Sequence, residues 1–445
     1  MSKRNFILLT IVLVIMVVLV FLFLFTRQNT TAPRTNTVGT NFISTFPTTN
    51  KTTTPPNTTP PANVSGYQPN PAVEAKLKLI KVSTTPVAGY AVYTKERFKE
   101  KNPSPALPLT GQGAKAPPAK GGSGGLTEFA PSLRYVARAT GNIYETFADK
   151  IEEKQFSSTV IPRVYEAYFG NSGNSVVMRY LKADNETIET FVGNTPKEYL
   201  GTEVAGKAEV KGTFLPEDTK DISVSPDAGS VFYLFNNSTT GNNMVGAILN
   251  LATNKKTQIL TSPFTEWLSL WPNAKMITLT TKPAAGVPGY MYAMNPTTKN
   301  LMGEVFGNIN GLTTLTSPNG KLVLYADDSL STSVYQTDTK TSTLMGVKTL
   351  SEKCVWGKAS DIVYCAVPKS INAGAYPDAW YQGIVSFSDQ IWEIDVKTGN
   401  ATLLADPAVI SGEDVDGIKL ALDSGENYLF FVNKKDSFLW ELALK

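Results

Sequence analysis

Residues 311–326 read GLTTLTSPNGKLVLYA, and residues 221–235 read DISVSPDAGSVFYLF. In both stretches two β-rich runs are joined by Ser-Pro, then Asn or Asp, then Gly. Pro presets φ for the first corner of a turn, Asn or Asp closes the turn with its side chain, and Gly accepts the positive φ that other residues avoid. Each stretch therefore predicts a β-hairpin.

The hairpin recurs as half of a larger unit. Each corner is followed by a second pair of β-rich runs, such as SVYQTDTKTSTLMGV (333–347), joined by an Asn or Asp turn. The first run of each unit begins near Asp221, Thr265, Leu312 and Glu352. This spacing of about 40 to 50 residues is typical of the four-stranded blades of a β-propeller.

Weaker copies extend the pattern over residues 76–445, with a low-complexity insertion at 99–125. The last unit, which begins at Gly417, supplies three strands only, and KLKLIKVST (76–84) can supply the fourth. Pairing of strands from both ends of the chain would close the ring and leave no open sheet edge. We expect an all-β propeller of seven four-stranded blades, with six or eight blades left open as alternatives.

The N-terminal region predicts a membrane anchor. Residues 6–25 form an unbroken apolar run in which Thr10 is the only polar residue, long enough for a helix over 6–26 to cross a bilayer. Lys3 and Arg4 precede the run, which favours a cytoplasmic stub at 1–5 and an extracytoplasmic propeller. A cleaved signal peptide is the alternative. Residues 27–75 are rich in Thr, Pro and Asn and predict a disordered stalk.

These features support a resemblance. The Ser-Pro-Asx-Gly corner followed by an aromatic or aliphatic strand resembles the repeats of TolB-like propellers and, more distantly, WD-type repeats, although the Trp-Asp and Gly-His signatures of the latter are absent. The anchor, the stalk, RYVARATGNIYE (134–145) and AYPDAWYQGIVSFSDQIWEID (375–395) resemble uncharacterised membrane-anchored propeller proteins of bacteria. The resemblance implies the fold and carries no established activity.

The amino-acid composition argues against several classes of function. The chain has 445 residues, with 41 Lys and Arg against 38 Asp and Glu, which argues against a nucleic-acid-binding domain. Histidine is absent, which excludes a Ser-His-Asp triad and histidine zinc sites. Asp414 and Asp416 have the spacing of a calcium loop, but its other ligands are missing, so an acidic surface turn is the preferred interpretation. We expect no metal site and no cofactor.

Cys354 and Cys365 are the only cysteines of the chain. If Ala359 and Ser360 form a two-residue hairpin loop, the register places the two cysteines directly opposite each other, close enough for a bridge. An extracytoplasmic location favours the disulfide, and two buried thiols are the alternative.

The long loop 367–388 carries the candidate binding residues Tyr376, Asp378, Trp380 and Tyr381. Aromatic rings beside a carboxylate are favoured at recognition surfaces, whereas a lid with buried aromatic rings is the alternative. We expect no catalytic residues and a non-catalytic module of the cell envelope that binds a protein or glycan partner, with contact to the membrane through the N-terminal helix. The alternative is a propeller-type glycosidase or lyase that uses carboxylates and Tyr.

Overall fold

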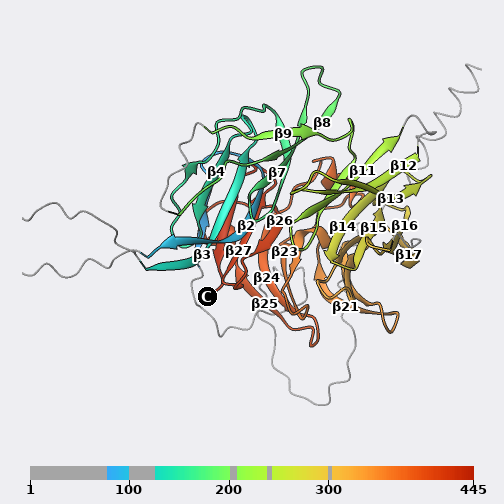
Figure 1. The fold of residues 1–445 in the computed structure, drawn as a ribbon. Coiled ribbons are helices and arrows are strands. Elements are labelled where there is room, and N and C mark those ends of the chain that lie inside the picture. The colour runs from blue at the N-terminus through green and yellow to red at the C-terminus, as the bar shows by residue number, and fades with distance from the viewer. Residues whose placement is uncertain (1–77, 100–125, 201–207, 238–242, 299–302) are drawn as a thin grey trace, which may run out of the picture. The chain divides into compact units, whose positions relative to one another are not determined.

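Seven antiparallel four-stranded sheets make up the fold, and they follow one another in chain order (Figure 1). The structure is a computed structural model that describes residues 78–99, 126–200, 208–237, 243–298 and 303–445. The predicted all-β propeller with seven four-stranded blades is confirmed.

Blades 1 to 4 are built from consecutive strands. Blade 1 consists of β2 (Val87–Phe98), β3 (Thr127–Ala137), β4 (Ile143–Phe147) and β5 (Lys154–Gln155). Blade 2 consists of β6 (Val164–Gly170), β7 (Ser175–Leu181), β8 (Ile188–Asn194) and β9 (Lys211–Phe214). Blade 3 consists of β10 (Asp221–Val224), β11 (Ser230–Asn237), β12 (Asn243–Asn250) and β13 (Lys256–Ser262). Blade 4 consists of β14 (Trp267–Asn273), β15 (Met276–Thr281), β16 (Pro288–Met294) and β17 (Gly303–Asn310).

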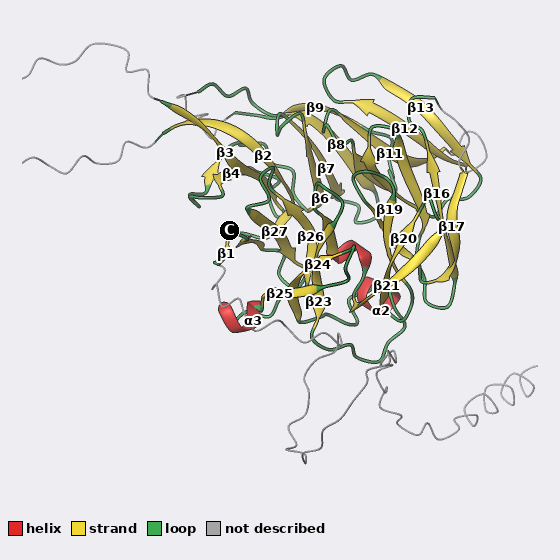
Figure 2. Ribbon diagram, turned by 90° about the horizontal axis from the view of Figure 1, so that it is seen from below, coloured by secondary structure: helices red, strands yellow, loops and turns green. Residues whose placement is uncertain are grey.

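Blades 5 to 7 include the short helices. Blade 5 consists of β18 (Thr313–Thr316), β19 (Leu322–Ala326), β20 (Ser331–Gln336) and β21 (Thr341–Lys348). Blade 6 follows the 3₁₀ helix η2 (Ser351–Lys353) and consists of β22 (Cys354–Trp356), β23 (Ile362–Pro368), β24 (Asp389–Asp395) and β25 (Ala401–Ala405), with α2 (Asp378–Tyr381) between β23 and β24. Blade 7 follows α3 (Pro407–Ile410) and consists of β26 (Gly417–Leu422), β27 (Tyr428–Asn433), β28 (Leu439–Ala443) and β1 (Leu79–Lys81). Figure 2 shows these helices as short segments among the loops.

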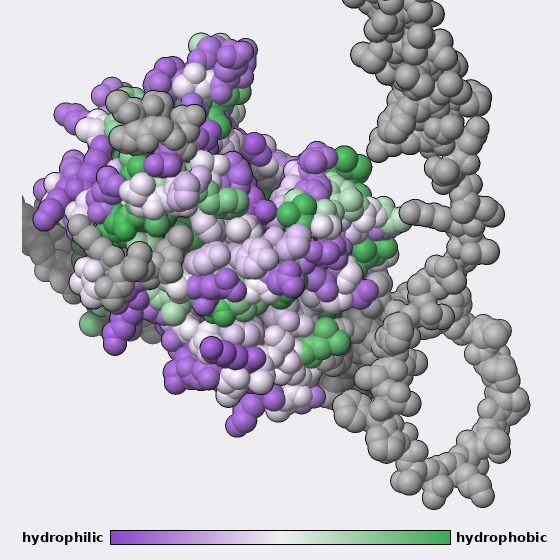
Figure 3. Space-filling model, turned by 90° about the vertical axis from the view of Figure 1, so that its right-hand side faces the viewer, coloured by the Kyte–Doolittle hydropathy of each residue, from purple (hydrophilic) through white to green (hydrophobic). Residues whose placement is uncertain are grey.

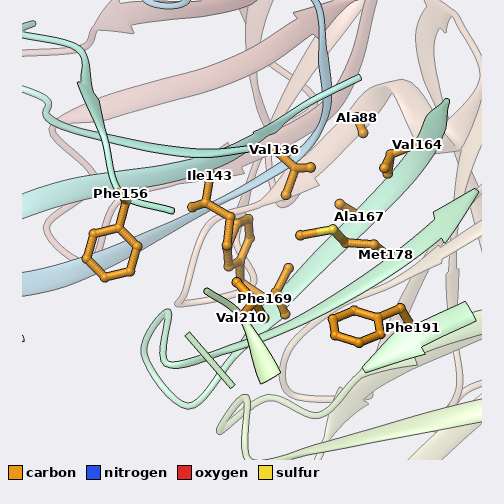
Figure 4. Close-up of a cluster of buried hydrophobic side chains, with 11 residues drawn as sticks. Ala88, Val136, Ile143, Phe156, Val164, Ala167, Phe169, Met178, Phe191 and Val210 are labelled. Atoms are coloured by element: carbon orange, nitrogen blue, oxygen red, sulfur yellow. The ribbon is translucent and has the colours of Figure 1, made fainter. Parts of the chain in front are cut away.

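The first strands of neighbouring blades contact each other, for example β2 with β6 and β10 with β14, so the first strands lie at the centre. The core fills the space between blades. Between blades 1 and 2, Val136 and Ile143 lie in one apolar cluster with Ala167, Phe169 and Met178 (Figure 4). Alternate side chains of each strand thus pack against the neighbouring blade, as the period of two requires.

The quoted corners are hairpin turns held by their Asx side chains. The Oδ1 atom of Asp227 accepts the N–H of Gly229 at 2.9 Å, and that of Asn319 accepts the N–H of Lys321 at 2.8 Å. Gly320 has a φ of 74°, as expected. In the other corner Ala228 takes the positive φ, at 54°, so the expectation that Gly holds this position there is wrong.

Strands from both ends of the propeller close blade 7. The first strand of the chain, β1, pairs antiparallel with β28, and Ile80 lies opposite Glu441. The expected fourth strand from residues 76–84 is therefore confirmed. Closure removes the open edge that β28 would otherwise present.

The cysteine prediction is confirmed as well. The register pairs Cys354 of β22 with Cys365 of β23, and the two residues form a disulfide. Their Cα atoms lie 4.1 Å apart. The bond joins the innermost strand of blade 6 to its neighbour.

The cytoplasmic stub, the membrane helix, the stalk and nearly all of the 99–125 insertion lie outside the described residues, and so they stay predictions. Within the described part of the chain, no helix combines the length and the apolar character that a membrane span needs.

Candidate functional site

An open cavity of about 950 Å³ lies against blades 7, 1 and 2. We call it the cleft. Its walls come from the connection between β27 and β28 (434–437), the residues after β3 (137–140) and the start of β6 (163–165). Because second-to-third connections and first-strand starts share one face of a propeller, residues far apart in sequence meet there.

Four cationic side chains line the cleft beside apolar residues. Arg138, Arg163, Lys434 and Lys435 line it, against a single acid, Asp436. Lys435 is paired with Asp414. Over the described ranges, no carboxylate forms an ion pair with any of the other three cations.

Neutral groups hold the two arginines in place. An Nη1 N–H of Arg138 donates to Ser437 Oγ at 2.7 Å. The guanidinium of Arg163 donates to the Asn185 side chain and to the carbonyl of Lys182. Since a guanidinium keeps its proton and has five N–H donors, both arginines retain charge and donor capacity for an anion.

Two tyrosines, Tyr144 and Tyr165, add aromatic surface to the cleft. The hydroxyl of Tyr165 is buried and has no hydrogen-bond partner among the described residues. Burial raises the pKa of Tyr165 to about 12, although the nearby Arg179 acts in the opposite direction. The phenol therefore keeps its proton at neutral pH and can donate it.

Lys434 connects the cleft to residues 369–388, which we call the lid loop. Its Nζ atom donates to the carbonyl of Trp380 at 2.8 Å and lies 4.8 Å from the centre of the Trp380 ring. Burial lowers the pKa of Lys434, the repulsion from Lys353 adds to this effect, and the carboxylates of Asp416 and Glu352 oppose it.

The four predicted binding residues of the lid loop have different environments. The rings of Tyr376 and Trp380 are 4% and 3% exposed and pack beside Phe387. The carboxylate of Asp378 accepts the N–H of Ala285 in blade 4 at 2.7 Å. Only Tyr381, which is 39% exposed and donates its hydroxyl to Glu352, offers an accessible ring among the three aromatic residues. Binding by these residues stays a prediction.

A buried charge cluster below the lid loop was not predicted. The Nζ atom of Lys353 pairs with Asp389 at 2.7 Å and with Asp416, and all three side chains are fully buried. Asp416 also accepts the indole N–H of Trp380 at 2.9 Å and the backbone N–H of Phe387 at 3.0 Å. Asp416 therefore anchors the lid loop. Asp414, which has calcium-loop spacing from Asp416 in the sequence, is instead paired with Lys435.

The cleft offers little to a metal ion. Throughout the described segments, no group of three Cys, Asp or Glu residues could hold a metal, and the chain has no histidine. One side of the propeller, shown in Figure 3, is mainly hydrophilic, with apolar residues in small separate groups.

No protein-family model matches the chain, and neither does any curated protein. Among solved structures, an oligogalacturonate lyase in complex with manganese matches with a TM-score of 0.45 and 9% identity, over 71% of this chain and 85% of the lyase. The oligogalacturonate lyase of Vibrio parahaemolyticus matches with a TM-score of 0.48 and 7% identity, over 71% of this chain and 86% of the lyase.

These matches correct the expected function. Both of these propellers are named as lyases, so we do not keep the expectation of a non-catalytic module without enzymatic activity. At this identity and TM-score the likeness shows the fold alone and assigns no substrate or residue to this chain. The resemblance to TolB-like, WD-type and membrane-anchored propellers remains a prediction.

Proposed function

We propose that this propeller is a lyase that cleaves an acidic oligosaccharide in the cleft. One observation carries the proposal: Arg138 and Arg163 line one open cavity and form no ion pair with a carboxylate anywhere in the described ranges. Both arginines are exposed, so their charges are accessible to an anionic ligand. A chain of uronic acid residues presents carboxylates at regular intervals, and bidentate pairs with guanidinium groups bind carboxylates well.

The cleft favours elimination over hydrolysis. A glycoside hydrolase of the usual kind needs two carboxyl groups on opposite sides of the scissile bond. Asp436 is the only acid among the residues that line the cleft, and its Oδ1 atom accepts the N–H of Phe438 at 3.0 Å. The expected chemistry with paired carboxylates is therefore not supported there, whereas a lyase needs only cations, a base and a proton donor.

Elimination uses these groups in a simple order. A guanidinium pairs with the uronate carboxylate and stabilises the negative charge that develops when the adjacent carbon loses its proton. The electron pair of that carbon–hydrogen bond forms a carbon–carbon double bond, and the bond from the next carbon to the glycosidic oxygen breaks. The leaving oxygen takes up a proton from the solvent in the open cleft. No water is consumed.

The test is an assay of the full chain with oligogalacturonate, and with a neutral galactan for comparison. Elimination creates a double bond conjugated with a carboxylate, so ultraviolet absorbance should rise with the acidic substrate only. Arg138→Gln and Arg163→Gln should each lower kcat/KM by roughly 10- to 100-fold, because each removes a charge-assisted hydrogen bond worth about 1.5–3 kcal/mol.

Arg97→Gln is the matched control. Arg97 lies near the far end of β2 from the cleft and pairs with Glu128 and Asp149, so its loss should leave kcat/KM unchanged. Equal activity on both glycans, or no product with oligogalacturonate, would contradict the proposed lyase.

A further inference from the structure

Lys434 lies where blade 7, the lid loop and the cleft meet. Its backbone N–H donates to the carbonyl of Asp416 at 2.8 Å, and its Nζ atom donates to the carbonyl of Trp380 at 2.8 Å. The residue is thus held at both ends, and it is one of the residues that line the cleft. An amine fixed in this way has lost most of the rotamer freedom of an ordinary lysine.

A second ammonium group shares the same indole. The Nζ atoms of Lys353 and Lys434 lie 5.3 Å and 4.8 Å from the centre of the Trp380 ring. Two like charges at one ring disfavour each other. Lys353 is paired with both Asp389 and Asp416. Lys434 has no ion pair in the described part of the chain. Of the two lysines at the Trp380 ring, Lys434 is therefore the one that gives up its proton more easily.

We infer that Lys434 is the base that removes the proton from the carbon beside the uronate carboxylate, with the lid loop as its positioning element. This inference rests on the proposed elimination. The neutral amine takes the proton and becomes an ammonium ion, the electron pair forms the carbon–carbon double bond, and the glycosidic oxygen leaves and takes a proton from solvent. The ammonium ion then returns its proton to solvent, which restores the amine.

The other cations of the cleft cannot take this role as well. Arg138 and Arg163 are guanidinium groups, which do not lose a proton at physiological pH. Lys435 is paired with Asp414, so its ammonium group is occupied by a carboxylate. The pKa of Lys434 is lowered by burial first, and then by Lys353, against the opposing charges of Asp416 and Glu352. A lowered pKa is what a lysine base needs near neutral pH.

The experiment compares two substitutions that both keep a positive charge. In Lys434→Arg the guanidinium still pairs with an anion but cannot act as a base, so kcat on oligogalacturonate should fall by roughly 10²- to 10⁴-fold while binding of oligogalacturonate changes little. Lys397→Arg, an exposed position in the turn between β24 and β25, is the matched control and should keep full activity.

Two further measurements separate a base from a structural residue. In Lys434→Ala, added small primary amines should restore part of the activity, with a rate that depends on the basicity of the amine. In the wild-type chain, the rise of kcat/KM with pH and the acetylation of Lys434 followed by mass spectrometry should report the same pKa, below that of an ordinary lysine.

The outcomes distinguish the two proposals. If the wild-type chain eliminates oligogalacturonate and Lys434→Arg remains active, the base is another residue and the inference about Lys434 is overturned while the lyase stands. If the wild-type chain binds oligogalacturonate but forms no unsaturated product, the lyase falls and the role of Lys434 falls with it. Loss of activity in Lys434→Arg without amine rescue of Lys434→Ala would also count against a base.

Discussion

Glu441 is a buried carboxyl group in β28, and its Oε2 atom has no hydrogen-bond partner within the described residues. Burial raises its pKa to about 8, with Asp149 and Asp423 adding to the effect and Lys78 opposing it. The folded protein keeps this proton at pH values where the unfolded chain has lost it. Glu441 therefore makes the free energy of unfolding decrease as pH rises from about 4.5 to about 8, by a few kcal/mol at most.

Glu441→Gln should remove this part of the pH dependence, because an amide of the same shape cannot ionise. Denaturant unfolding at about pH 5 and about pH 8.5 should give a smaller difference in stability than in the wild-type chain. Glu304→Gln, at an exposed position of β17, is the control and should change nothing. An unchanged pH dependence in Glu441→Gln would show that this carboxyl group is ionised in the folded protein.

At the same scale, the cleft residues show what the sequence could not reveal. Arg138 and Tyr144 lie in RYVARATGNIYE, a stretch that the sequence analysis singles out as a motif. Arg163 and Lys434, in contrast, lie in connections of other blades that carry no recognisable motif. What defines the site is the lack of a carboxylate partner for these cations, and that depends on which side chains the ring brings together.

At the scale of elements, the inner strands were predictable and the outermost ones were not. The predicted starts at Asp221, Thr265, Leu312 and Glu352 fall within two residues of the starts of β10, β14, β18 and β22. These strands have buried side chains, and β10, β14 and β18 lead into corners closed by Asp227, Asn273 and Asn319. The fourth strands β5 and β9 are fully exposed in their burial pattern, so no alternation of apolar residues marks them.

The lid loop is anchored by the buried side chain of Trp380. Trp380→Ala should lower the free energy of unfolding by roughly 3–5 kcal/mol, because it removes a buried ring and the hydrogen bond to Asp416. Tyr381→Ala should cost much less, since that ring is partly exposed. Denaturant unfolding of the two variants decides between a structural lid and a free recognition surface: similar small losses would favour the surface.

At the scale of the whole molecule, the ring depends on a three-residue strand. Besides its pairing with β28, β1 brings Lys81 into an ion pair with Glu413 at 2.6 Å and to within 5.0 Å of the ring centre of Trp440. Backbone bonds from Val82 to Leu439 and from Ala443 to Lys78 flank the pairing, and their alternation places Ile80 opposite Glu441 in a hydrogen-bonded pair.

Ile80→Pro should therefore open the ring at blade 7. Proline removes the N–H of this central pair and cannot continue the ladder, so β28 becomes an unpaired edge. We expect a lower Tm, fast amide exchange along β28 and a tendency to associate through the exposed edge. Lys78→Pro is the matched control, because the structure uses the carbonyl of Lys78 as an acceptor for Ala443 and proline retains a carbonyl. If both variants melt and exchange like the wild-type chain, the pairing of β1 with β28 contributes nothing to stability. Side-chain packing against the neighbouring blades must then hold blade 7 in the ring.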